Sequence, residues 1–162
     1  MKRKFRITGL GGTFLLLACV AGCGGPEKPE GLPELVPCIV KVVQEGQPLA
    51  EAEILLHQQD ASGTAWTIGG ITNDAGEAKI FTYGKFEGSP EGTFKVTVSK
   101  VEIDPGEMTR DGAADNAKVY DLVEPQYSNI LKTPLTLDVV KGTSKYEVDA
   151  GKIVHTTRRS TN

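Results

Sequence analysis

The chain has 162 residues, and its 18 lysines and arginines stand against 21 aspartates and glutamates, for a net charge of −3. An acidic chain is a poor partner for nucleic acid or for anionic lipid headgroups, because both present negative phosphates. The length allows one domain with a substantial core, flanked by terminal segments.

Residues 1–22 carry the pattern of a secretory signal. Four basic residues lie within Met1–Arg6, and an apolar stretch follows to about Val20. This stretch is too short for a permanent membrane span, which needs roughly 20 apolar residues. It ends in Val-Ala-Gly-Cys, which resembles the lipobox of bacterial lipoproteins. We therefore predict a lipoprotein signal peptide over 1–22, cleavage before Cys23 and lipid on Cys23; the alternative is an ordinary signal peptide with an incidental cysteine.

Cleavage would change the charge and the cysteine content of the chain. Loss of the four basic residues leaves 14 basic against 21 acidic residues, a net charge of −7. Cys19 leaves with the signal and Cys23 is acylated, so only Cys38 remains and no internal disulfide is possible. Cys38 lies in an apolar run without basic neighbours, which favours a buried, unreactive thiol over a nucleophilic or redox thiol.

Residues 23–35 are predicted to form a tether. After the lipidated cysteine the sequence reads GGPEKPEGLPEL, with three prolines, three glycines and three glutamates. Proline and like charges keep such a chain extended. It would span about 35 Å at most, at roughly 3 Å per residue.

Alternating apolar and polar residues predict strands over the next hundred residues. A period of two is typical of strands with one buried face. The expected strands are Cys38–Val43, Ala52–Leu56, Ala65–Thr72, Ala78–Tyr83, Phe94–Ser99, Leu135–Val139 and Lys145–Asp149. No stretch of ten residues shows a helical stripe. The pattern predicts an all-β chain, an antiparallel sandwich of about seven strands.

Turn residues separate these strands. Asn73-Asp74-Ala75-Gly76 has the asparagine and glycine of a type I turn, with Gly76 at positive φ. Glu45-Gly46-Gln47 predicts a second tight reversal, and Ser89-Pro90-Glu91-Gly92 predicts a third.

Four segments together resemble the carboxypeptidase regulatory-like domain. Residues 45–54 resemble its G-x-P-L-x-x-A-x-V opening, and 72–78 its T-[DN]-x-x-G hairpin. Residues 90–98 resemble its P-x-G-x-Y-x-V-x-V strand, with Phe94 in the aromatic position, and 125–135 resemble the closing section of small bacterial lipoproteins built on this domain. The resemblance covers most of 36–151. It implies a transthyretin-like β-sandwich that is generally non-catalytic and contributes no catalytic residues.

Residues 102–125 form an acidic insertion that the family pattern does not explain. Its acidic residues are Glu102, Asp104, Glu107, Asp111, Asp115, Asp121 and Glu124, against Arg110 and Lys118. A long irregular loop on a rigid domain is either functional or solvated and disordered. Calcium binding is a further alternative, here and at Asn73, Asp74 and Glu77, although the spacing of an EF-hand is absent.

No catalytic pattern stands out. The two histidines are His57, at a predicted strand end, and His155, near the C-terminus. Asp60 and Ser62 are close to His57 in sequence, but a catalytic triad is defined in space and no G-x-S-x-G motif is present. We predict that the protein is not an enzyme and has no catalytic, cofactor-binding or metal-binding residues.

Trp66 has two possible roles. An exposed tryptophan on a sandwich stacks on sugar rings, whereas a tryptophan within a strand more often packs in the core. Core packing is the favoured interpretation.

Residues 152–162 are polar and end in basic residues, which predicts a flexible tail. The sequence as a whole predicts a non-catalytic binding or structural module in the cell envelope, facing outside the cytoplasm and held to a membrane by lipid on Cys23. No nucleic-acid partner is expected, and a protein or glycan partner would bind through 102–125. The alternatives are an envelope enzyme or enzyme accessory subunit, and a carbohydrate-binding module.

Overall fold

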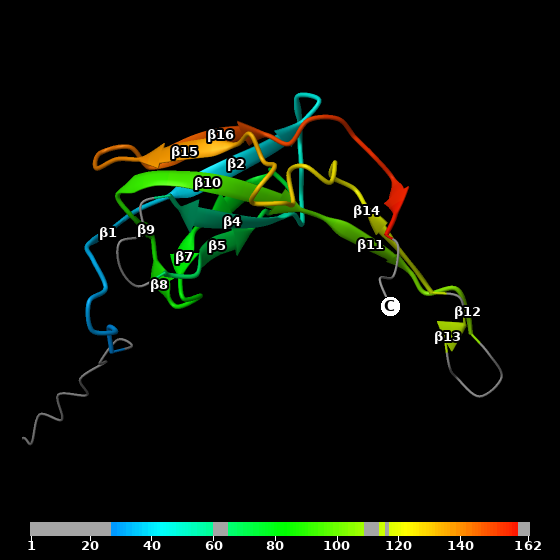
Figure 1. Ribbon diagram of the computed structural model, residues 1–162, viewed down its shortest axis with the longest axis horizontal. Coiled ribbons are helices and arrows are strands. Elements are labelled where there is room, and N and C mark those ends of the chain that lie inside the picture. Colours follow the sequence, from blue (N-terminus) through cyan, green and yellow to red (C-terminus); the bar gives the residue numbers. More distant parts are fainter. Residues whose placement is uncertain (1–26, 60–64, 109–113, 116, 159–162) are drawn as a thin grey trace, which may run out of the picture.

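The computed structural model describes residues 27–59, 65–108, 114–115 and 117–158. Cys23 and the predicted signal peptide lie outside these residues. Every regular element in the described part is a β-strand (Figure 1). The predicted all-β class is therefore confirmed. The described residues include no helix long and apolar enough to cross a membrane.

The larger sheet has six antiparallel strands. Its order is β15-β10-β4-β5-β7-β8. The strands are β4 (Glu53–Gln58), β5 (Ile68–Ile71), β7 (Phe81–Thr82), β8 (Phe86–Glu87), β10 (Gly92–Ser99) and β15 (Thr136–Val139). The long strand β10 bonds to β4 on one side and β15 on the other. β10 is therefore an interior strand, one position in from the edge strand β15 (Figure 1).

The smaller sheet is centred on β2 (Ile39–Gln44). One edge of β2 bonds to β16 (Lys145–Asp149), and the other is shared by β3 (Gln47–Pro48) and β6 (Glu77–Lys79). The β2–β16 pair is parallel, which differs from the purely antiparallel prediction. Parallel strands need a long connection, and here the chain that connects β2 to β16 contains most of the domain. The local alternation of apolar and polar residues does not indicate which distant strand pairs with β2, or in which direction.

The two sheets share one hydrophobic core, and the predicted inward positions are confirmed. Ala52, Ile54 and Leu56 are all buried, as expected from their alternation. The core takes Val40 and Val42 from the smaller sheet and Phe94, Val96, Val98 and Val139 from the larger one. Each large side chain buried in this way stabilises the fold by about 1.5–3 kcal/mol.

The predicted strand Ala78–Tyr83 is divided between the two sheets. Residues 77–79 pair with β2, whereas 81–82 pair with β5. Between them Ile80 is buried, and its amide donates to the carbonyl of Cys38 at 2.9 Å. The chain therefore crosses from one sheet to the other at Ile80, a change that alternation alone does not reveal.

The predicted turn at Asn73–Gly76 is confirmed. The Gly76 amide donates to the Asn73 carbonyl at 2.8 Å, and the Asn73 side-chain oxygen accepts from the amides of Ala75 and Glu77. Gly76 has the expected positive φ, at 73°. The reversal at Glu45–Gly46 is also confirmed, because β3 pairs with β2 directly after it. The third predicted turn differs: Ser89 and Pro90 belong to a strand, and the chain bends at Glu91.

The Gly76→Ala substitution is expected to cost more stability than Gly46→Ala. Both glycines have positive φ, 73° and 77°, so each methyl costs about 1–2 kcal/mol in backbone strain. A Cβ at Gly46 meets nothing within 4 Å, whereas one at Gly76 would lie 2.6 Å from the Val42 carbonyl oxygen. We expect about 1–3 kcal/mol of additional loss at Gly76. Urea unfolding of both variants measures the difference, and equal losses would contradict the close approach to β2.

The last residues of the predicted tether are bound to the domain. β1 (Leu35–Val36) pairs with β9 (Ser89–Pro90). The Lys141 ammonium lies 3.1 Å from the Glu34 carboxylate. A Cβ at Gly88 would lie 2.5 Å from the Val36 carbonyl oxygen, so this approach requires glycine. The length of chain free to act as a spacer is therefore shorter than the predicted 23–35.

Candidate functional site

Much of the acidic insertion forms a β-ribbon, which we call the arm. It contains β11 (Val101–Asp104), β12 (Glu107–Met108), β13 (Ala114–Asp115) and β14 (Lys118–Asp121). β11 pairs with β14, and β12 with β13, both antiparallel. Figure 1 shows the arm continuing from the end of β10 and extending away from the two sheets, at the end of the domain opposite β1. The expectation of an irregular loop over 102–125 is therefore wrong where these four strands form.

The predicted flexible tail contributes a third strand to the arm. β17 (Thr156–Thr157) pairs with β14, and the Arg158 amide donates to the Val119 carbonyl at 2.7 Å. The Arg158 guanidinium forms an ion pair with the Asp121 carboxylate, with Nε 3.1 Å and 3.3 Å from its two oxygens. Hydrogen bonding to Asp121 raises the pKa of Arg158 above its ordinary value. The expectation of a flexible tail from 152 is therefore wrong for 156–158.

His155 adds a second attachment of the tail. Its ring stacks on Tyr120, with centroids 4.1 Å apart and planes at 22°. The imidazole Nε2 lies 3.7 Å from the Glu102 carboxylate. A basic segment thus binds an acidic ribbon through backbone pairing, ring stacking and charge together.

Gln44 joins the root of the arm to the tail. This side chain at the end of β2 is only 4% exposed. Its Nε2 donates to the Leu122 carbonyl at 3.0 Å and to the Lys152 carbonyl at 2.8 Å. One amide group therefore fixes both chain segments where they leave the domain.

The Gln44→Leu substitution is expected to loosen this junction. It removes both donors from two carbonyls, and we expect a loss of about 1–3 kcal/mol in unfolding free energy. Amide hydrogen exchange at Arg158 should also become faster, because the tail loses one attachment. Gln47→Leu, at an exposed position on the adjacent strand, is the control and should leave both quantities unchanged. Unchanged exchange at Arg158 in Gln44→Leu would contradict the proposed junction.

The described residues do not bring the catalytic candidates together in one site. His57 lies on β4, and its Nε2 is 2.9 Å from the Thr97 hydroxyl. Burial lowers the pKa of His57 below its usual value. Asp60 and Ser62 lie outside the described residues. His155 lies in the tail, against Tyr120 of the arm, and takes no part in this arrangement.

Cys38 is buried, as predicted. It is a free thiol with 2% of its surface exposed, and burial raises its pKa from 9.0 to about 11. A thiol with so high a pKa is protonated at neutral pH and is a poor nucleophile.

Three of the oxygen ligands considered for calcium have other partners. The Asn73 side-chain oxygen accepts backbone amides, and Glu77 pairs with Lys145 at 3.4 Å. In the insertion, the Asp104 carboxylate accepts from the Gly106 amide. Across the described residues, no group of three or more histidines, cysteines, aspartates or glutamates is arranged to hold a metal.

Trp66 is partly buried and packs against the core. Its ring meets Tyr83 edge to face, with centroids 5.3 Å apart. The predicted strand Ala65–Thr72 is shorter in the structure, where β5 spans Ile68–Ile71, so Trp66 precedes the strand. The favoured role in core packing agrees with these contacts.

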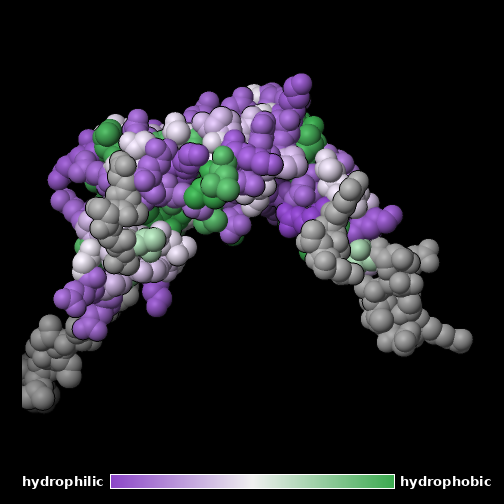
Figure 2. All heavy atoms as spheres, viewed as in Figure 1, coloured by the Kyte–Doolittle hydropathy of each residue, from purple (hydrophilic) through white to green (hydrophobic). Residues whose placement is uncertain are grey.

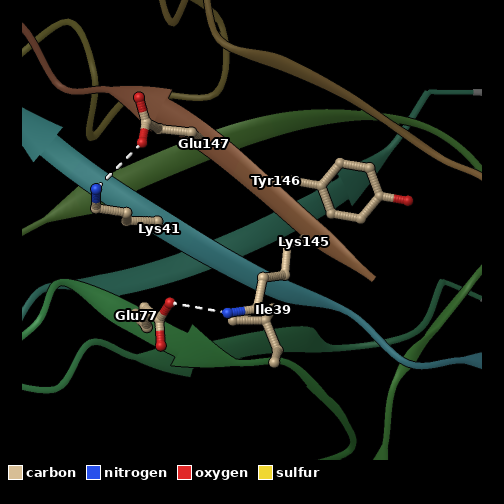
Figure 3. A pocket seen from close by; sticks show the side chains of 6 residues that line it. All are labelled: Ile39, Lys41, Glu77, Lys145, Tyr146 and Glu147. Carbon is tan, nitrogen blue, oxygen red and sulfur yellow. Dashed lines mark hydrogen bonds and ion pairs between the residues drawn. The ribbon is translucent and has the colours of Figure 1, made fainter. Parts of the chain in front are cut away.

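A shallow hollow lies on the outer side of the smaller sheet (Figure 3). It has a volume of about 240 Å³ and is lined by Ile39, Lys41, Glu77, Lys145, Tyr146 and Glu147. Two ion pairs cross it, Lys41–Glu147 at 3.3 Å and Lys145–Glu77 at 3.4 Å (Figure 3). Its charged groups are paired with one another, so the hollow offers little to a ligand. The face of the molecule seen in Figure 2 is mostly hydrophilic, with smaller hydrophobic patches.

No family model and no curated protein matches this chain. Among solved structures, a 9R-lipoxygenase from Cyanothece PCC8801 is similar with a TM-score of 0.33 and 12% identity. The match covers 78% of this chain and 18% of the lipoxygenase. A similarity at this level carries no argument about fold or activity.

Proposed function

We propose that this protein is a lipid-anchored module of the bacterial cell envelope that binds a partner and does not catalyse a reaction. The observation that carries the proposal is the sequence from Met1 to Cys23, with its basic head, short apolar run and Val-Ala-Gly-Cys end. The first strand, β1, begins at Leu35, so a short linker separates the cysteine from the folded domain. This order of signal, lipid site, linker and domain is typical of proteins displayed at a membrane surface.

The domain is proposed to be transthyretin-like and related to the carboxypeptidase regulatory-like family. Three observations support this. The segments that resemble the family's opening and hairpin contain the turns at Glu45–Gly46 and Asn73–Gly76. Phe94, in the family's aromatic position, is fully buried in the core.

The arm is the proposed contact surface. It extends from the end of the domain opposite β1, whose chain leads back to the lipid site (Figure 1). A partner bound there would therefore meet the end of the domain that lies opposite β1 (Figure 1). Residues on β11 are exposed along its whole length.

The intact mass of the protein purified from membranes of its native host tests the anchoring. We expect a mass corresponding to residues 23–162 plus acyl chains. An unmodified mass that begins at another residue would overturn the anchoring and leave a free secreted domain.

A further inference from the structure

The arm has one strand edge that no described segment covers. Its sheet has the order β11-β14-β17, so β14 is paired on both sides and β11 on one. An exposed strand edge presents unpaired backbone groups to a further strand. The β11 edge is thus a place where an extended chain can add to the sheet.

The hydrogen-bond pattern identifies the groups that face this edge. The Leu122 amide donates to the Lys100 carbonyl, so Lys100 directs its backbone groups toward β14. Bonded and non-bonded positions alternate in an antiparallel pair. Glu102 and Asp104 therefore also bond toward β14, and the amides and carbonyls of Val101 and Ile103 point outward.

The side chains of β11 divide between two faces of the arm. Val101 and Ile103 share one face, and they are 43% and 65% exposed. Glu102 and Asp104 are exposed on the other face. Directly opposed residues of two strands point to the same face. A strand that adds here would therefore place apolar residues beside Val101 and Ile103 and basic residues beside the two carboxylates.

The opposite edge of the same sheet already binds a short strand with a basic residue beside it. There β17, whose two residues are Thr156 and Thr157, adds to β14, and the neighbouring Arg158 pairs with Asp121. The sequence from 102 to 125 has seven acidic and two basic residues, which favours a basic partner strand. A second copy of the chain fits less well, because pairing Val101 with the Ile103 of that copy would set two Glu102 carboxylates opposite each other.

We propose that the β11 edge binds an extended segment of a partner protein in which basic and apolar residues alternate. The segment adds as a fourth strand to the arm, next to β11. Backbone bonds to Val101 and Ile103 supply affinity, and the alternating side chains supply selectivity. This inference deepens the proposed function, since it names the chemistry of the partner.

A synthetic peptide tests the proposal on the purified full chain. The probe is a fluorescent, end-capped peptide of about eight alternating lysine and valine residues, which matches a typical strand length. Fluorescence anisotropy should show saturable binding that weakens as salt rises. A peptide of the same composition with its lysines and valines in separate blocks, and one with glutamate for lysine, should both bind at least about tenfold more weakly. Equal binding of all three peptides would overturn the proposal.

Two variants locate the binding. Ile103→Pro removes an outward amide but none of the bonds to β14, and we expect about tenfold weaker peptide binding. Ile103→Thr keeps the amide and serves as its control. Asp104→Lys reverses an exposed charge without touching the edge amides and should also weaken binding severalfold. Wild-type affinity in both Ile103→Pro and Asp104→Lys would overturn the assignment to β11, as would self-association of the chain that blocks the peptide.

The peptide measurement is independent of the anchoring. It applies to the chain whether or not Cys23 carries lipid, so a failure to bind leaves the intact-mass result unchanged. An unmodified mass for the protein from its native host, combined with normal peptide binding, would overturn the anchoring alone.

Discussion

The Cys23→Ser variant is expected to keep residues 1–22 and to carry no lipid. Serine has no thiol to accept the diacylglyceryl group, and cleavage of a lipoprotein signal follows that modification. Two or more acyl chains give stable anchoring, because each buried methylene contributes about 0.8 kcal/mol. Residues 23–162 have a net charge of −7 and therefore little affinity of their own for an anionic surface.

Metabolic labelling with a fatty-acid analogue, followed by intact-mass measurement, checks this result. The matched control is Cys19→Ser, which changes a cysteine within the same apolar run and should be labelled and cleaved normally. Cys38→Ser should also be labelled, since Cys38 lies in the folded core. Normal cleavage and labelling of Cys23→Ser would show that residues 20–23 are not a lipobox.

The Phe94→Ala substitution is expected to cost about 3–5 kcal/mol of unfolding free energy. Phe94 is fully buried and lies on β10, where it faces Gln58 on β4 and Leu137 on β15. Truncation removes a large apolar surface and leaves a cavity between the two sheets. A loss of this size is a large share of the 5–15 kcal/mol that stabilises a typical domain.

Urea unfolding compares Phe94→Ala with Thr93→Ala on the same strand. The Thr93 side chain points to the opposite, exposed face and bonds to Asp138 at 2.7 Å. Its loss should cost about 1 kcal/mol or less. Similar losses of unfolding free energy at the two positions would contradict the burial of the Phe94 side chain in the core.

The sequence predicts the body of this fold because its strands alternate locally. Ala52, Ile54 and Leu56 are buried as their spacing predicts, and Asn73 and Gly76 form the expected turn. Each of these features depends on residues within a few positions of one another. Positive φ at Gly76 likewise follows from the turn in which the glycine lies.

The arm depends on contacts between distant segments. Val101–Asp104 alternates apolar and acidic residues, which is a signal for a strand, whereas Lys118–Asp121 reads Lys-Val-Tyr-Asp and does not alternate. The many acidic residues of the insertion favour a solvated loop instead. The pairing of Thr156 with Asp121 joins segments 35 residues apart in sequence, and no local pattern indicates it. Gln44 is similar, since only the fold brings its amide to two carbonyls from separate loops.

The parallel pairing of β2 with β16 has a mechanical consequence. β2 is the strand nearest to Cys23 along the chain, apart from the short β1, and β16 leads to the tail that is attached to the arm. If the chain were held at Cys23 and pulled at the tail, β2 would be drawn toward its N-terminal end and β16 toward its C-terminal end. In parallel strands these ends are opposite, so the hydrogen bonds between them would be loaded together in shear. Tension along this path would therefore meet the resistance of all these bonds at once and would not open them one at a time.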